Sequence, residues 1–395
     1  MSARPDPSIA FDVFLKACST LARADWSGDA DLLARIGSED EAAVVALAGR
    51  HGVRSLVARS LAWAEAAGWT PGAPTRKLLA YRDERLVLQL RRRAKVADAL
   101  GALQAAGTEP IVFKGFVLAE EVFGDLSARS FGDCDVLVRP QAYERAVEAL
   151  GDLGYRRKVD GAPIAELMQS DWHGVSFAGA DGVAIDLHWA LGHDIPMRFN
   201  DLVWRTAGAP PPSGLPGLRL SPELTLVHLA AHFAHHDFRE LRPLIDFYVA
   251  ACRLAEQADP ERTEGLARTL GLAQTVRLAA MICRRHLRPR AAVERLSRGT
   301  ASLRTRASAA ALGRRALLTK SQHPLAVWGD GLKRRLMTDA PGALLRWLQV
   351  WLAPSPESLA QRFARPYRWT LYPRYYLVQA YRVTTQSRRL FIDLR

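Results

Sequence analysis

Three aspartates with the spacing of strand residues are the side chains of this sequence best suited to carry chemistry. Asp133 and Asp135 lie in the segment 131–138, and Asp186 lies in a second segment, 183–189. Alternate side chains of a strand project from the same face, so Asp133 and Asp135 are expected to point together. In the second segment apolar residues alternate with Asp186, which places this carboxylate on a polar face. The sequence therefore predicts three converging carboxylates.

Clustered carboxylates need a cation. Two like charges 4 Å apart repel by about 4 kcal/mol at an effective dielectric of 20, so loss of Asp133 or Asp135 is predicted to raise the melting temperature of the metal-free protein. Oxygen ligands suit Mg²⁺, which usually keeps water and substrate phosphates as further ligands. We therefore expect a site for Mg²⁺, or Mn²⁺, that acts on phosphates. The alternative is that these are ordinary strand-end aspartates that cap turns.

A turn upstream of these strands has the residues of a phosphate site. Lys114 and Gly115 follow the apolar segment 111–113 and precede a helical pattern, 116–123. Backbone N–H groups at the start of a helix can hold phosphate, and Lys114 would add a positive point charge. The alternative is a loop lysine beside a turn glycine.

Several histidines could line a second part of the site. His188 shares the polar face of Asp186, and His228, His232 and either His235 or His236 recur at helical spacing. The glutamate of the H-E-x-x-H zinc motif is absent, because Leu229 follows the first histidine. Two readings remain open: structural histidines between domains, or an acceptor pocket formed by His188, His232 and His236, with Asp237 or Asp246 as a further member.

The elements expected to position these residues give an α+β fold class: an α/β-type core with a small mixed sheet, flanked by mainly helical N- and C-terminal regions. A long amphipathic helix is predicted over 81–106, a hairpin turn at 179–182 and a linker or long loop at 208–217. Four regions are expected. They are a helical N-terminal region (1–107), the α/β core (108–205), a helical domain (206–320) and a basic, aromatic-rich C-terminal region (321–395).

The order of these motifs resembles the nucleotidyltransferase superfamily of the DNA polymerase β type, and more closely the bacterial family of uncharacterised nucleotidyltransferases. The resemblance is carried by Val112–Gly115, by Ser127–Val138, which places Arg129 before the D-x-D strand, and by Ile185–Trp189. The helical segments 226–232 and 244–246 are also similar. It covers about residues 80 to 250.

This resemblance implies transfer of a nucleoside monophosphate from an NTP to a small-molecule or protein acceptor. Asp133 and Asp135 would bridge two metal ions, and Asp186 would hold the ion nearer the acceptor. Lys114, Gly115 and Arg129 would contact the phosphates. The turn of the wider superfamily is usually Gly-Ser or Gly-Gly, whereas this chain has Gly115-Phe116. The alternative function is therefore a catalytically degenerate binding or scaffold protein, linked to envelope polysaccharide or modified-peptide biosynthesis.

Composition limits the classes of protein to which the chain can belong. The 395 residues are 49% hydrophobic and 24% charged, as in globular proteins, and contain no apolar run long enough to span a bilayer. The first seven residues lack the pattern of a secretion signal, so a cytoplasmic protein is expected. The net charge of +13 is concentrated in residues 331–395, which hold twelve Lys or Arg and three Asp or Glu. This tail could pack on the fold, contact an anionic membrane at its inner face, or, third in order, bind nucleic acid.

Overall fold

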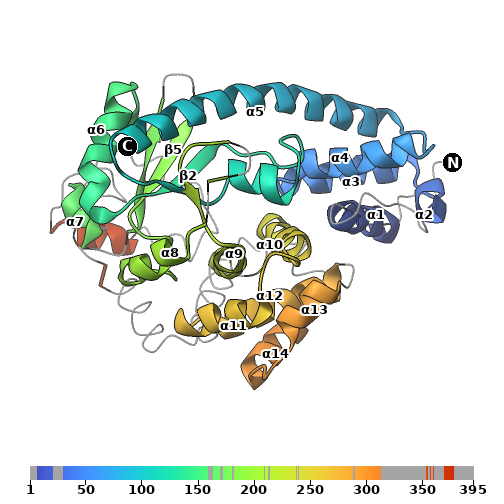
Figure 1. Ribbon diagram of the computed structural model, residues 1–395. Coiled ribbons are helices and arrows are strands. Elements are labelled where there is room, and N and C mark those ends of the chain that lie inside the picture. Colours follow the sequence, from blue (N-terminus) through green and yellow to red (C-terminus); the bar gives the residue numbers. More distant parts are fainter. Residues whose placement is uncertain are drawn as a thin grey trace.

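We analysed a computed structural model of the chain. It describes residues 7–20, 30–158, 163–169, 172–179, 182–208, 210–211, 214–236, 238, 240–287 and 290–312, together with 353, 354, 356, 359 and 369–377. The fold is α+β, as the sequence predicts: one mixed sheet is surrounded by helices (Figure 1).

The sheet has six strands in the order β3-β4-β5-β2-β1-β6. The β2–β5 and β1–β6 pairs are parallel, and the other neighbours are antiparallel. The strands are β1 (Ile111–Val112), β2 (Asp133–Leu137), β3 (Arg156–Arg157), β4 (Gly174–Ala178), β5 (Ala184–His188) and β6 (Leu218–Arg219). The predicted hairpin is confirmed, because β4 and β5 pair across the turn that contains residue 182.

The register of the two central strands sets the position of the carboxylates. Asp135 pairs directly with Asp186, and Leu137 pairs with His188. The alternate residues of both strands, among them Cys134 and Ile185, are fully buried in a hydrophobic cluster on the opposite face of the sheet. Strand alternation therefore separates a polar face, which carries the candidate chemistry, from an apolar face, which anchors the sheet.

The apolar face is covered by two helices, α5 (Ala73–Ala105) and α6 (Tyr143–Asp152). Figure 1 shows α5 running along the top of the molecule, from the N-terminal helices to the sheet. Its C-terminal half buries Val96, Leu100 and Leu103 in the hydrophobic cluster on the apolar face of the sheet. The helix begins eight residues before the predicted Tyr81, because a proline near its first position favours helix initiation after Gly72.

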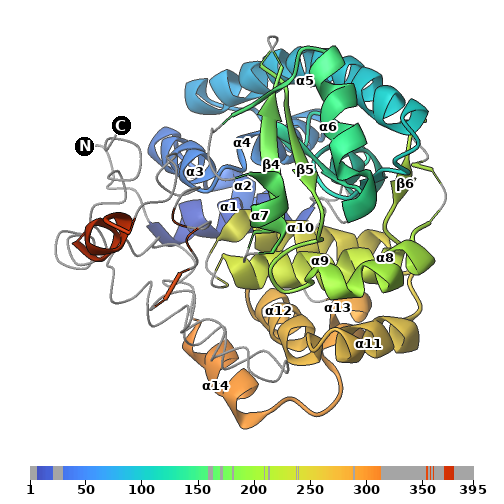
Figure 2. The same cartoon turned by 90° about the vertical axis from the view of Figure 1, so that its left-hand side faces the viewer.

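The other helices form a second hydrophobic cluster that adjoins the polar side of the sheet. Figure 2 shows α9 and α10 below the strands, with α11 to α14 farther out. The N-terminal helices belong to the same cluster. These helices are α1 (Pro7–Thr20), α2 (Ala30–Ala34), α3 (Ser38–Arg50), α4 (Arg54–Ala66), α9 (Pro222–His235), α10 (Leu241–Arg253), α11 (Pro260–Thr269), α12 (Ala273–His286), α13 (Ala291–Ser297) and α14 (Leu303–Ala311). Short helices α7 (Ile164–Met168) and α8 (Asn200–Thr206) lie within the core region.

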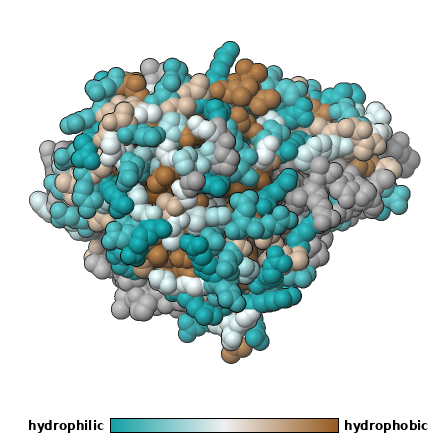
Figure 3. All heavy atoms as spheres, viewed as in Figure 1, coloured by the Kyte–Doolittle hydropathy of each residue, from teal (hydrophilic) through white to brown (hydrophobic). Residues whose placement is uncertain are grey.

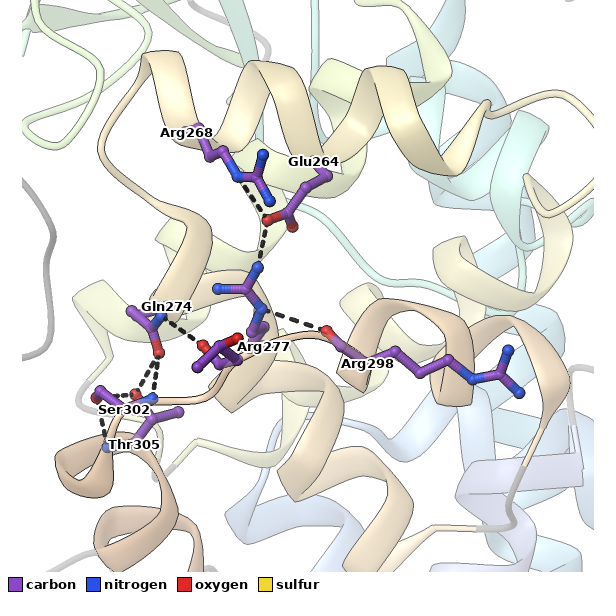
Figure 4. Close-up of polar contacts among 8 residues, drawn as sticks. Glu264, Arg268, Gln274, Arg277, Arg298, Ser302 and Thr305 are labelled. Carbon is purple, nitrogen blue, oxygen red and sulfur yellow. Dashed lines mark hydrogen bonds and ion pairs between the residues drawn. The ribbon is translucent and has the colours of Figure 1, made fainter.

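A polar hub joins the last four of these helices (Figure 4). Arg277 of α12 donates to the Glu264 carboxylate of α11 and, at 3.3 Å, to the Arg298 carbonyl after α13. Gln274 accepts from Ser302 N–H at 3.0 Å and from Thr305 Oγ1 at 2.8 Å, at the start of α14. The hub fixes these outer helices to one another, and α11, α12 and α13 pack on α9 and α10.

The sequence does not predict β6, which follows the expected linker at 208–217. The Leu218 N–H donates to the Pro110 carbonyl at 2.8 Å, and β6 then pairs with β1. Gly217 allows this close approach, because its φ is +98° and a Cβ there would lie 2.7 Å from the same carbonyl oxygen. The segment after the core therefore supplies an edge strand of the sheet.

The surface is mixed in character. Figure 3 shows a hydrophobic patch where α5 crosses the top of the molecule, and the exposed large apolar side chains of that helix are Val87 and Leu90. No helix among the described residues is long and apolar enough to cross a membrane. In the C-terminal region, Leu359, Leu371 and Tyr375 form a small buried cluster, whereas most of the predicted basic and aromatic surface lies outside the described residues.

Candidate active site

The centre of the site is a group of three side chains on the polar face of β2 and β5. One ligand atom from each of Asp135, Asp186 and His188 lies within 4.8 Å of the other two. Ser176, on the adjacent strand β4, donates to Asp186 Oδ1 at 2.6 Å and so orients this carboxylate. The group can hold a divalent cation, as the sequence predicts for the two aspartates.

Asp133 lies at the start of β2, outside this group of three, and is exposed. Partial desolvation of its carboxyl, reinforced by the nearby charges of Asp135 and Asp186, raises its pKa above the usual value. Asp133 therefore sits at the exposed start of β2, where a cation would relieve its repulsion by the other two carboxylates.

Lys114 supplies positive charge to the centre. Its Nζ lies 2.8 Å from Asp135 Oδ1, and His188 Nε2 approaches the same oxygen at 3.3 Å. Burial acts to raise the pKa of Asp135, but the attraction of Lys114 and His188 outweighs it and holds this pKa well below its usual value. Asp135 is therefore ionised at neutral pH.

The turn between β1 and the following helical segment requires glycine. Gly115 has a φ of +58°, and a Cβ on it would lie 2.9 Å from the backbone oxygen of Asp133. The next residue, Phe116, is buried against Phe131, with ring centroids 3.8 Å apart. The side chain after Gly115 is therefore part of the apolar core. In a Gly-Ser turn, this position would instead carry a hydroxyl that could face a phosphate. The helical segment continues as η1, a π-helix over Leu118–Val122.

Arg129, expected at the phosphates, is directed to other partners. Its Nε and Nη2 donate to the two carboxylate oxygens of Asp246 on α10, each at 2.9 Å, and Nη1 donates to the Gly115 carbonyl at 3.3 Å. Burial acts to lower the pKa of Arg129, yet Asp246 raises it above the usual value. The pair is almost completely buried. Asp246 therefore holds Arg129 in place, and Arg129 in turn holds the Gly115 turn.

The loop that follows Arg129 is also held from outside. Arg242 on α10 donates to the Ser130 carbonyl, and Gln89 and Arg92 on α5 donate to the Phe131 carbonyl at 3.2 and 2.6 Å. Helices from both sides therefore fix the entry to β2. Sequence reasoning missed Arg242, Gln89 and Arg92, because nothing in their local spacing indicates a contact with a loop 39 or more residues away.

A pocket walled by imidazoles adjoins the centre. His188 and His232, two of the predicted acceptor residues, lie in its wall. The described lining residues are Lys114, His173, His188, Leu191, Gly192, His193, Asp194, Ile195, His228, Ala231, His232 and His235. The third predicted residue, His236, is outside this set: its Nδ1 lies 3.3 Å from the Glu240 carboxylate, and its ring packs on His232 at 4.7 Å.

The inner histidines of this pocket are uncharged near neutral pH. Burial first, and then the positive charge of Lys114, lowers the pKa of His228 to about 3 and that of His232 well below its usual value. Burial together with neighbouring histidines has the same effect on the pKa of His173. His173 and His193 were missed in the sequence. Nothing in the sequence spacing links either residue to the D-x-D strand. In the structure, Gly174 beside His173 allows His188 to approach, because a Cβ there would lie 2.8 Å from His188 Nδ1.

A comparison with protein families identifies the chain. The family described as uncharacterised nucleotidyltransferase matches residues 37–288. The chain belongs to this family. The matched part includes every site residue described above, from Gln89 to Asp246, and ends before the basic C-terminal region. No curated protein and no solved structure matches the chain.

Proposed function

We propose that this family member is a divalent-metal-dependent enzyme of the DNA polymerase β-like superfamily that transfers a nucleoside monophosphate from an NTP to a small-molecule or protein acceptor. The observation that carries the proposal is the convergence of Asp135, Asp186 and His188 beside the Lys114-Gly115 turn. Family membership supports transfer of a nucleotidyl group, and the site offers both a cation position and a phosphate position.

The donor set fits a divalent cation. Asp135 and Asp186 would hold it, with Asp133 positioned for a second ion that also contacts the nucleotide, and Mg²⁺ or Mn²⁺ is the expected cofactor. Such an ion would neutralise the charge that develops on the transferring phosphoryl group. Lys114 and the backbone N–H groups after Gly115 would hold the phosphates, and Arg129 would act by fixing the turn.

The remaining steps fall to residues of the chain itself. An acceptor oxygen attacks the α-phosphorus, the bond to the bridging oxygen breaks, and pyrophosphate leaves. Asp186, oriented by Ser176, is placed to accept the proton of the acceptor. We place the acceptor in the imidazole-walled pocket, with His188 and His232 in its wall and His236 behind His232.

The test is incubation of the purified chain with each labelled NTP and Mg²⁺ or Mn²⁺, with and without a cell extract. Pyrophosphate release and label transfer are expected, and both should fall at least about 100-fold in Asp135→Asn and Asp186→Asn. NTP binding without any transfer would favour the alternative of a degenerate scaffold, which the buried Phe116 supports. Neither binding nor transfer would contradict both functions.

A further inference from the structure

His188 differs from the other histidines of the pocket in how its ring nitrogen is placed. One of its ring nitrogens belongs to the three-atom group with Asp135 and Asp186, and its Nε2 lies 3.3 Å from Asp135 Oδ1. Both ring nitrogens of His188 are buried, and neither has a partner with hydrogen-bond geometry among the described residues. A buried imidazole beside two carboxylates, with neither nitrogen in a hydrogen bond, is suited to coordinate a cation.

The surroundings of His188 hold the ring in this orientation. The edge of Phe113 packs on it with centroids 5.2 Å apart, and His173 stacks on it at 5.3 Å. On the β4 side, Gly174 leaves no room for a Cβ, which would lie 2.8 Å from Nδ1. The imidazole is therefore fixed before any ion binds, which reduces the entropy cost of using it as a ligand.

We propose that His188 is a metal ligand, and that Asp135, Asp186 and His188 form a mixed oxygen and nitrogen site that prefers a first-row transition ion to Mg²⁺. The proposal rests on the proposed function and deepens it by naming the class of ion. Mg²⁺ binds oxygen almost exclusively, whereas imidazole nitrogen favours transition ions. Mn²⁺ is the weakest binder of that series, so it is the strictest probe of the preference.

Lys114 competes for the same position. Its Nζ lies 2.8 Å from Asp135 Oδ1, the oxygen that His188 also approaches. An ion bound to this oxygen would displace the ammonium group, which would then be free to contact a nucleotide phosphate. Lys114→Met should bind Mn²⁺ about tenfold more tightly than the wild type, because the ammonium group no longer competes for Asp135. It should bind NTP about tenfold more weakly, because the same ammonium group no longer contacts a phosphate. A parallel loss of both affinities, or no change in either, would overturn the exchange.

The main test uses Mn²⁺ and the full-length, nucleotide-free protein. Electron paramagnetic resonance measures free Mn²⁺ and hence affinity, and electron spin-echo modulation detects nitrogen bound to the ion. His188→Gln replaces the nitrogen by an amide oxygen. His228→Gln is the matched control, because His228 packs its ring on the same Phe113 at the same 5.2 Å but lies outside the three-atom group. Circular dichroism confirms that both variants fold.

In the wild type we expect ¹⁴N modulation and an affinity for Mn²⁺ at least about tenfold higher than for Mg²⁺. The modulation should disappear and the preference should fall to about threefold or less in His188→Gln, whereas His228→Gln should retain both. Bound Mn²⁺ without ¹⁴N modulation would overturn the role of His188 and leave the proposed transferase intact. No bound Mn²⁺, together with no nucleotidyl transfer, would instead overturn the proposed function.

Discussion

The two aspartates of the D-x-D strand have opposite electrostatic surroundings. Asp135 is buried with Lys114 as its counter-ion, whereas Asp133 is exposed, and its pKa is raised by partial desolvation and by the charges of Asp135 and Asp186. Sequence spacing alone treats them as equivalent and predicts that loss of either stabilises the metal-free protein. The structure restricts that prediction to Asp133.

We therefore expect the two substitutions to shift stability in opposite directions in the presence of chelator. Asp133→Asn should raise the free energy of unfolding by less than about 1 kcal/mol, because it removes repulsion at an exposed position. Asp135→Asn should lower it by about 2 kcal/mol, because Lys114 loses its partner. Urea denaturation measures both, and a stabilised Asp135→Asn would show that Lys114 does not neutralise this carboxylate.

Gly115 provides a second prediction at the scale of single residues. Gly115→Ala and Gly124→Ala both place a side chain at positive φ, +58° and +67°, which costs about 1 kcal/mol in each case. Only at Gly115 does the new Cβ meet a backbone atom, 2.9 Å away on β2. Gly115→Ala should therefore be less stable than Gly124→Ala by more than about 1 kcal/mol and should also lose metal affinity. Equal melting temperatures and equal metal affinities would refute close packing of the turn on β2.

At the scale of elements, the Arg129–Asp246 pair joins α10 to the turn before the helical segment. Removing one member leaves the other buried without a partner, so Arg129→Met and Asp246→Asn should each cost about 3 kcal/mol or more. The double variant should cost much less than the sum, because the two side chains act as a unit. Thermal and chemical denaturation of all four proteins gives the coupling energy, and additive losses would argue against the pair.

The sequence predicts those elements whose pattern is local. The alternation around Asp135 and Asp186 predicts β2 and β5 and the shared face of their carboxylates. The parallel pairing that aligns Asp135 with Asp186 is not local, because β2 and β5 are joined by a long connection. Arg129 illustrates the same limit: its position before the D-x-D strand suggests phosphate, but its partner Asp246 lies 117 residues later.

At the scale of the whole molecule, the buried neutral histidines make stability depend on pH. His228 has a folded-state pKa of about 3, below the value of about 6.5 in an unfolded chain, so the unfolded state binds more protons between these values. The contribution of these histidines to the free energy of unfolding is therefore fully present above about pH 6.5. It decreases as pH falls below this value, by about 1.4 kcal/mol per pH unit for each such histidine.

His228→Gln should reduce this dependence. The variant lacks one of the titrating groups, so its free energy of unfolding, measured in urea with chelator from pH 7 to pH 4, should fall less steeply than that of the wild type. His236→Gln, at a partly exposed position, is the control and should leave the slope close to the wild-type value. If both variants matched the wild type, His228 would have to be protonated in the folded state.

The pairing of β6 with β1 has a consequence for how the chain can be divided. A fragment that stops at residue 205 lacks an edge strand of the sheet, and it also lacks Asp246, the partner of buried Arg129. A fragment that begins at residue 108 lacks Gln89 and Arg92, which hold the entry to β2. The smallest piece that keeps these contacts runs from the start of α5 to the end of α10. A gene fusion that moves the candidate metal site intact into another protein must therefore include the helices on both sides of the sheet.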